Sequence, residues 1–311
     1  MTRPAVSVDV ERLGRRFGDR HALRDVSFAV VPGEMTALLG PNGGGKTTLF
    51  RILATLLRPT SGDARVFGHS VVTSAGPARR RMGVVFQRPS LDLKLTVAEN
   101  LAHHGRLYGL SGRCLRERAA ASLDKLGLAG RAGDRAERLS GGLQRRAELA
   151  KALMHEPDLL LLDEPSTGLD PNVRREVLDH LEGIARAGGT VLMTTHFMDE
   201  AERCGKVGIL HEGMLAAFDT PDRLKGRIHG DVVRVHGRDP AALGARIRER
   251  FRLTPSLVDG WLRLETQSGH LLAAQVVEAF PEEISSVTWG RPTLDDVFVG
   301  LTGRRLGEAA A

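Results

Sequence analysis

Residues 40–47 read Gly40-Pro41-Asn42-Gly43-Gly44-Gly45-Lys46-Thr47 and fit the pattern G-x-x-x-x-G-K-[ST]. A short apolar segment, residues 35–39, precedes this stretch, and residues 49–57 after it have helical spacing. In the order strand, loop and helix, the glycines let backbone N–H groups point inward at a phosphate without a Cβ in the way. The stretch therefore predicts an α/β fold built around a phosphate-binding loop rather than a chance glycine-rich turn.

The loop also predicts how a nucleotide and its metal are held. The Lys46 ammonium can reach β- and γ-phosphates, and the Thr47 hydroxyl can bind Mg²⁺. The helix from Thr48 directs the positive end of its dipole at the same phosphates. We expect nine residues to contact the nucleotide, namely Gly40, Pro41, Asn42, Gly43, Gly44, Gly45, Lys46, Thr47 and Thr48.

A second apolar run ends in two acids. Residues 159–162 are four leucines, and the lack of alternation is typical of a strand buried on both faces in a parallel sheet. The carboxyl end of such a strand lies beside the phosphate loop. We expect Asp163 to hold Mg²⁺, directly or through water, and Glu164 to polarise the attacking water. An ordinary strand end capped by acids is the alternative, and the upstream loop disfavours it.

Residues 139–146 read Leu-Ser-Gly-Gly-Leu-Gln-Arg-Arg, and Ser140 stands 23 residues before Asp163. This stretch resembles the signature motif of ABC-transporter ATPases, and the resemblance covers about residues 4–220. It implies a P-loop NTPase fold, with a RecA-like core, an antiparallel β subdomain and an α-helical subdomain. It also implies ATP and Mg²⁺ as ligands. Leu143 departs from the Gln of many members.

Further positions match the family in order. The resemblance implies that Phe17 stacks on adenine, in place of a common Tyr, since only the ring face is used. Gln87 matches the Q-loop and would join Thr47 and Asp163 around the metal. Asp170 lies in the D-loop. His196 matches the switch histidine, which would contact the γ-phosphate and act with Lys46 and Glu164 in catalysis. The remaining implied nucleotide contacts are Ser140, Gly141 and Gly142.

The resemblance further implies a dimer. In the family two domains close head to tail, so that each ATP lies between the Lys46 loop of one copy and residues 140–142 of the other. This chain has one set of motifs, so we expect a homodimer or a dimer with a close homologue. Residues 90–139 occupy the place where family members receive the coupling helix of a membrane permease, with Asp92 and Glu99 near that groove.

The sequence pattern changes near residue 225. Residues 1–225 are expected to form the ATP-binding domain and residues 226–311 a small accessory α+β domain with ferredoxin-like βαββαβ order plus one helix. Trp261 and Trp289 are expected in its core. Residues 292–304 resemble the tail of ATPase subunits of ABC-2 type exporters, including daunorubicin-resistance-like drug exporters. This implies an ATPase that couples dimer closure and hydrolysis to efflux and antibiotic resistance.

The composition limits location and partners. The 311 residues are 41% hydrophobic, which excludes wholesale disorder, and Lys+Arg exceeds Asp+Glu by 44 to 38. No signal peptide and no apolar run of about 18 residues is seen. We therefore expect a peripheral protein on the cytoplasmic face of the plasma membrane, with a separate permease chain as partner and no nucleic acid.

Two alternatives stay open. The positive charge motivates a soluble ABC ATPase acting on nucleic acid or the ribosome. Against this, residues 48–139 are too few for the coiled coil of DNA-repair members, and translation-factor members carry two motif sets. An importer ATPase is the second alternative, although sugar importers have larger β-rich C-terminal domains. Drug, lipid, polysaccharide and peptide all remain open as cargo.

Overall fold

The chain divides into two compact units, which a computed structural model describes for residues 6–304 and 306. The first unit comprises residues 1–215 and the second residues 216–311. The boundary between the two compact units lies about ten residues before residue 225, where the sequence pattern changes. The expected boundary between an ATP-binding domain and an accessory domain stays a prediction.

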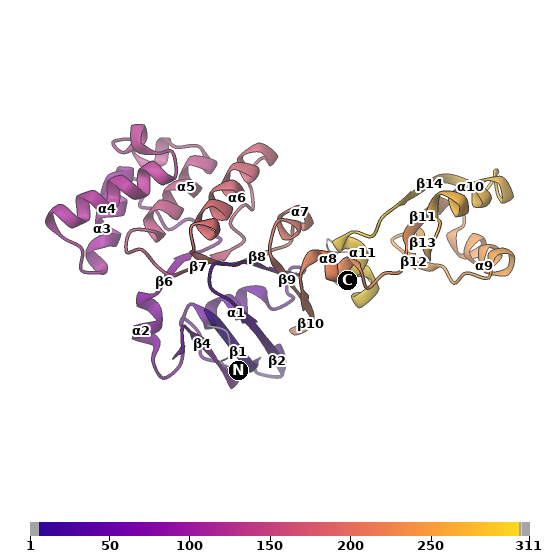
Figure 1. Cartoon of the computed structure of the whole chain (residues 1–311), viewed down its shortest axis with the longest axis horizontal. Helices are drawn as coiled ribbons and strands as arrows, with labels where there is room; N and C mark the ends of the chain where they lie inside the picture. The colour runs from indigo at the N-terminus through magenta and orange to yellow at the C-terminus, as the bar shows by residue number, and fades with distance from the viewer. Residues whose placement is uncertain (1–5, 305, 307–311) are drawn as a thin grey trace. The chain divides into compact units, whose positions relative to one another are not determined.

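A six-stranded sheet, whose edge strand β10 crosses the boundary after residue 215, forms the centre of the first unit (Figure 1). Its order is β10-β9-β3-β8-β7-β6, with strands β3, β6, β7, β8 and β9 parallel where they pair. All residues of β3, β7 and β8 are buried, which agrees with the lack of alternation in the four leucines of β7. The strands span Met35–Leu39 (β3), Met82–Val85 (β6), Leu159–Asp163 (β7), Thr190–Thr195 (β8), Lys206–His211 (β9) and Met214–Asp219 (β10).

A separate antiparallel sheet has the order β2-β1-β4-β5. Its strands span Val8–Phe17 (β1), Arg20–Val30 (β2), Ser61–Val66 (β4) and His69–Ser70 (β5). Strand β4 begins at Ser61, which lies opposite Gly14 of β1. Gly62 permits this, because its φ is +71° and a Cβ there would lie 2.2 Å from the carbonyl oxygen of Arg12 on β1.

Helix α1 (Lys46–Leu53) packs between the two sheets, against β2 and β4 on one side and β7 and β8 on the other. The phosphate loop is thereby held at the carboxyl end of β3 by a buried helix. The remaining helices of this unit are α2 (Ala75–Arg80), α3 (Val97–Leu107), α4 (Gly112–Lys125), α5 (Gly141–Ala152), α6 (Pro171–Arg186) and α7 (Met198–Glu202), with 3₁₀ turns η1 (Ala129–Arg131) and η2 (Ala136–Arg138).

Helices α3, α4 and α5 pack on one another and form the α-helical subdomain (Figure 1). A capping box starts α3, since the Thr96 hydroxyl accepts from the Glu99 N–H and the Glu99 carboxylate accepts from the Thr96 N–H. The expected P-loop fold with an antiparallel β subdomain and a helical subdomain is confirmed.

The second unit has the ferredoxin-like order. Its sheet runs β12-β13-β11-β14 with every neighbouring pair antiparallel. Valines and leucines from β11 and β13 pack with helices α9 and α10 in one core. The elements are α8 (Pro221–Lys225), β11 (Asp231–Gly237), α9 (Pro240–Phe251), β12 (Ser256–Val258), β13 (Trp261–Thr266), α10 (Gly269–Ala279), β14 (Ile284–Gly290) and α11 (Leu294–Thr302).

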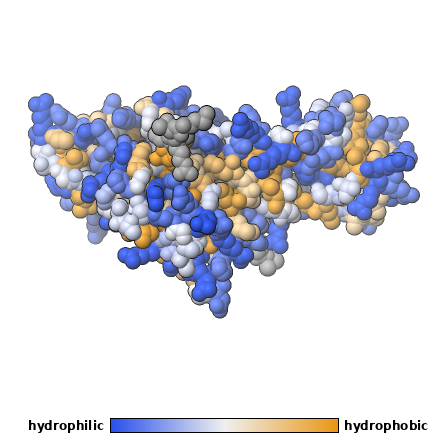
Figure 2. All heavy atoms as spheres, turned by 60° about the horizontal axis from the view of Figure 1, so that its bottom comes forward, coloured by the Kyte–Doolittle hydropathy of each residue, from blue (hydrophilic) through white to orange (hydrophobic). Residues whose placement is uncertain are grey.

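The expectation that both tryptophans lie in this core is wrong for Trp289. Its side chain, on the edge strand β14, is 54% exposed. Trp261 is half-buried against the His236 ring. Across the surface in Figure 2, hydrophilic residues cover most of the visible face and hydrophobic ones are scattered among them. Among the described helices, none is both long and apolar enough to span a membrane.

Candidate nucleotide site

A cavity of about 290 Å³ opens over the phosphate loop. The cavity brings the phosphate loop together with Phe17, which is expected to stack on adenine. It also brings in Gln87 and Glu164, which are expected near the γ-phosphate and the metal, although all these residues are far apart in the sequence. The lining residues are Phe17, Arg20, Ala22, Pro41, Asn42, Gly43, Gly45, Lys46, Thr47, Thr48, Gln87 and Glu164. The geometry therefore gathers most of the expected site at the carboxyl end of β3.

Two glycines of the loop are required by its shape. Gly45 caps α1 with φ 104°, a left-handed conformation that leaves no side chain over the helix start. A Cβ on Gly40 would lie 2.2 Å from the carbonyl oxygen of Leu210 on β9. The first N–H groups of α1 thus face the cavity side without a capping side chain, which is the arrangement that binds an anion.

Lys46 is folded back onto its own loop. Its Nζ donates to the carbonyl oxygens of Gly40 at 2.7 Å and Pro41 at 3.0 Å, and it lies 3.3 Å from Oε1 of Glu164. The side chain is 4% exposed. Burial lowers the pKa of Lys46, and the neighbouring Glu164 carboxylate opposes that shift.

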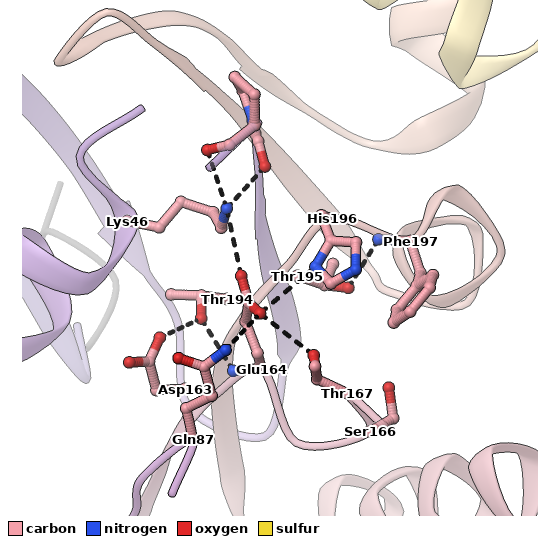
Figure 3. Close-up of polar contacts among 12 residues, drawn as sticks. Lys46, Gln87, Asp163, Glu164, Ser166, Thr167, Thr194, Thr195, His196 and Phe197 are labelled. Carbon is pink, nitrogen blue, oxygen red and sulfur yellow. Dashed lines mark hydrogen bonds and ion pairs between the residues drawn. The ribbon is translucent and has the colours of Figure 1, made fainter. Parts of the chain in front are cut away.

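Glu164 is the centre of the contacts in Figure 3. Its Oε2 accepts from Gln87 Nε2 at 3.1 Å and from the Thr167 hydroxyl at 3.1 Å, and lies 3.3 Å from Nδ1 of His196. Burial by itself raises the pKa of Glu164, but the charges of Lys46 and His196 outweigh it and hold the pKa below its ordinary value. The residue has φ 47°, a strained conformation for a non-glycine residue.

Asp163 lies behind Glu164 and is 3% exposed. The Thr194 hydroxyl donates to its Oδ1 at 2.6 Å and accepts from the Glu164 N–H at 3.0 Å. Burial raises the pKa of Asp163, and the Thr194 hydrogen bond opposes the rise. One threonine on β8 thus orients both acids at the end of β7.

The expected Mg²⁺ ligands supply only oxygen atoms, which suits this ion. Thr47 and Gln87 line the cavity, whereas Asp163 does not. Mg²⁺ usually keeps several waters and takes one or two carboxylates together with substrate phosphates, so a set with a single acid fits. In the described part of the chain no group of three or more His, Cys, Asp or Glu side chains is placed to hold a metal.

The residues of the signature motif do not line this cavity. Ser140 and Gly141 are exposed at the start of α5, where the Ser140 hydroxyl accepts from the Leu143 N–H. Gly142 is buried, and a Cβ there would lie 2.2 Å from Cγ1 of Val173 on α6. In the D-loop the Asp170 carboxylate caps α6 and likewise lies outside the cavity lining.

Phe17 is 46% exposed at the end of β1, directly opposite Arg20 on β2. One face of its ring carries the Arg15 guanidinium, whose carbon lies 4.4 Å from the ring centroid. An exposed aromatic ring beside a phosphate loop is suited to stacking on a base.

Sequence reasoning gave no role to Arg145 and Glu200, two buried charged residues beside the site. Arg145 on α5 donates to backbone carbonyls of the turn after β7, including Pro165 at 2.5 Å. Glu200 on α7 is fully buried and accepts from the hydroxyls of Ser166 and Thr195, the latter at 2.5 Å. The sequence shows that Arg145 stands within residues 139–146 and that Glu200 follows His196 by four residues. Their burial is not visible in the sequence, because it depends on packing between distant segments.

The sequence matches the ABC transporter family over residues 23–167. It is 39% identical to the daunorubicin resistance ATP-binding protein DrrA3 of Streptomyces coeruleorubidus, in an alignment covering 98% of this chain and 99% of the relative. The Nod factor export ATP-binding protein I of Paraburkholderia xenovorans is 38% identical, with 97% and 99% covered.

Solved structures of similar shape agree. The structure of an ATP-binding subunit of an ABC transporter matches with a TM-score of 0.64 and 30% identity, covering 71% of this chain and 92% of the other. The dimeric cassette MJ0796, bound to ADP and phosphate in a post-hydrolysis state, matches with a TM-score of 0.62 and 27% identity. That alignment covers 68% of this chain and 98% of the cassette.

Proposed function

This chain belongs to the family of ABC transporter ATP-binding subunits, and from that premise we propose how it binds and hydrolyses ATP to drive export. The single observation that carries the proposal is the contact of Glu164 with Lys46, Gln87 and His196 at one end of the phosphate-loop cavity. Lys46 supplies a cation for the phosphates, and Glu164 supplies a carboxylate for the attacking water. Gln87 and His196 are two polar groups that face this carboxylate.

In the proposed mechanism the loop N–H groups and Lys46 hold the β- and γ-phosphates, and Phe17 stacks on adenine. Glu164 accepts a proton from the attacking water. At the same time the water oxygen bonds to the γ-phosphorus, and ADP leaves. His196 orients the γ-phosphate beside Glu164. Thr47, Gln87 and Asp163 would hold Mg²⁺, which when bound neutralises charge on the phosphate oxygens.

A second copy would complete the site. Ser140 and Gly141 are exposed and none of residues 140–142 lines the cavity, so within one chain these groups do not reach the phosphates of a nucleotide there. A head-to-tail dimer, formed by two copies or with a close homologue, would bring the signature of one chain over the loop of the other. Asp170, which caps α6 near that helix start, would lie at the same contact.

The cargo would pass through a separate membrane permease. The relatives named above are a drug-resistance protein and an export protein, which favours export over the importer and nucleic-acid alternatives. We propose that the α-helical subdomain, with Asp92 and Glu99 near its groove, receives the permease at the cytoplasmic face of the membrane. Binding of ATP would close the dimer and hydrolysis would reopen it.

Glu164→Gln tests the mechanism. The amide keeps the size of the side chain but cannot accept the proton from water, so the variant should bind ATP, form dimers and hydrolyse slowly. Hydrolysis is followed by phosphate release, and association by sedimentation with and without ATP. Hydrolysis at the wild-type rate would show that Glu164 is not the base, and absence of ATP-dependent dimers would contradict the two-copy site.

A further inference from the structure

Three charged residues line one buried face of α5, the helix that Ser140 caps. Arg145, Glu148 and Lys151 follow one another at a spacing of three residues, which places them along one side of the helix. Their side chains are only 8%, 1% and 10% exposed. Charges so deeply buried need partners that hold them, and all three have partners in segments that carry the proposed catalytic residues.

Arg145 joins the catalytic turn to the start of the Gln87 segment. Its guanidinium donates to the carbonyl oxygens of Pro165 at 2.5 Å and Glu164 at 3.3 Å. The same group donates to the carbonyl oxygen of Phe86, the residue before Gln87, at 2.6 Å. One side chain on α5 therefore fixes the backbone on which both Glu164 and Gln87 stand.

Glu148 and Lys151 hold the other end of the segment that carries Gln87, at Ser90. The Glu148 carboxylate accepts from the backbone N–H of Ser90 at 2.5 Å and from its hydroxyl at 3.1 Å. Lys151 Nζ donates to the Ser90 carbonyl oxygen at 3.0 Å. Because Glu148 also lies 3.8 Å from Arg145, the three charges form one continuous group. Gln87 is thus held on both sides by a single helix.

We propose that Arg145, Glu148 and Lys151 act together as positioning residues, the α5 clamp, which keeps Gln87 and the turn of Glu164 in a fixed relation to the helix that carries Ser140. The clamp rests on the proposed function, since it takes the roles of Gln87 and Glu164 from there. A helix is rigid over this length, so a displacement of Ser140 on dimer closure moves the Gln87 backbone and the Glu164 turn with it.

Glu148→Gln in the full chain is the first test. The amide keeps an oxygen to accept from Ser90 but removes the charge that holds Lys151. We expect kcat for ATP hydrolysis to fall at least tenfold while KM for ATP stays within threefold, because the variant still binds the nucleotide. Lys151→Met is measured in parallel, as a second variant that leaves the Ser90–Glu148 contact intact. It should likewise lower kcat and leave KM for ATP within threefold of the wild type.

Asp296→Asn is a matched control. Its carboxylate is 1% exposed and accepts from the backbone N–H of Thr293 at 2.9 Å and its hydroxyl at 2.7 Å, the same pair of contacts, within residues 216–311. This variant should lower the melting temperature about as much as Glu148→Gln and leave kcat unchanged. Equal loss of kcat in both variants would mean that a damaged fold, and not positioning, lowers the rate.

The decisive measurement combines Glu148→Gln with Gln87→Ala. If Glu148 acts through Gln87, adding Glu148→Gln to Gln87→Ala should lower kcat less than threefold further. A tenfold loss in both backgrounds, or no loss in the single variant, would overturn the clamp. Failure of the proposed function is distinguishable, because the wild-type chain would then neither bind nor hydrolyse ATP.

Discussion

The ion pair between Lys46 and Glu164 must break when phosphates bind, and this leads to a prediction about affinity. The charged atoms lie 3.3 Å apart, with side chains 4% and 7% exposed. At an effective dielectric constant of about 20, two unit charges at that distance attract by about 5 kcal/mol. Because ATP draws the Lys46 ammonium to its phosphates and Glu164 repels those phosphates, Glu164→Gln should bind ATP more tightly than the wild type.

The expected gain is at least tenfold in the dissociation constant, or about 1.4 kcal/mol. It is smaller than the full attraction for two reasons. The carbonyl oxygens of Gly40 and Pro41 still accept from Lys46 in the variant, so the ammonium keeps part of its stabilisation. Burial also lowers the pKa of Lys46, and loss of the carboxylate lowers it further, which reduces the charge available to the phosphates.

The assay is displacement of a fluorescent ATP analogue in EDTA, at a protein concentration where sedimentation shows monomers. Under these conditions neither hydrolysis nor dimer closure contributes to the measured affinity. Thr167→Val is the control, because it removes a 3.1 Å hydrogen bond to Glu164 without changing a charge, and it should stay within twofold of the wild type. Equal or weaker binding by Glu164→Gln would refute the reasoning.

Two further predictions concern stacking and pH. Phe17→Ala should weaken ATP binding by about 1–3 kcal/mol in the same displacement assay, and Phe17→Tyr should bind like the wild type; equal affinity of all three would rule out stacking. Burial, followed by the charges of Lys151 and His155, lowers the pKa of His104 to about 4. In this pH range the folded chain therefore binds fewer protons than the unfolded chain. As the pH drops from about 6.5 to about 4, the free energy of unfolding falls, and His104 contributes about 3 kcal/mol to that loss. Thermal unfolding of His104→Phe across that range should show a smaller loss than the wild type, and an unchanged slope would contradict the assignment.

Elements with a strong local pattern were predictable from the sequence, because residue type and spacing determine them. The strand expected over the four leucines at residues 159–162 is β7, which extends one residue further, to Asp163. Strands β4 and β5 and helices α2 and α8 escaped prediction, since they are short and largely polar. Their pairing depends on neighbours such as β1, which lies about 50 residues earlier in the chain.

The sequence by itself determined the family, the phosphate loop and the identity of the two acids after β7, because residue type and spacing carry the chemistry of phosphate and metal binding. Only the tertiary structure decided what surrounds them. It placed Thr194 between Asp163 and Glu164, paired Lys46 with Glu164, and buried the charges of the α5 clamp against two distant backbones. These contacts join residues from 20 to 118 positions apart, and no local pattern encodes them, because a buried charge is recognisable only by the partners that packing brings to it.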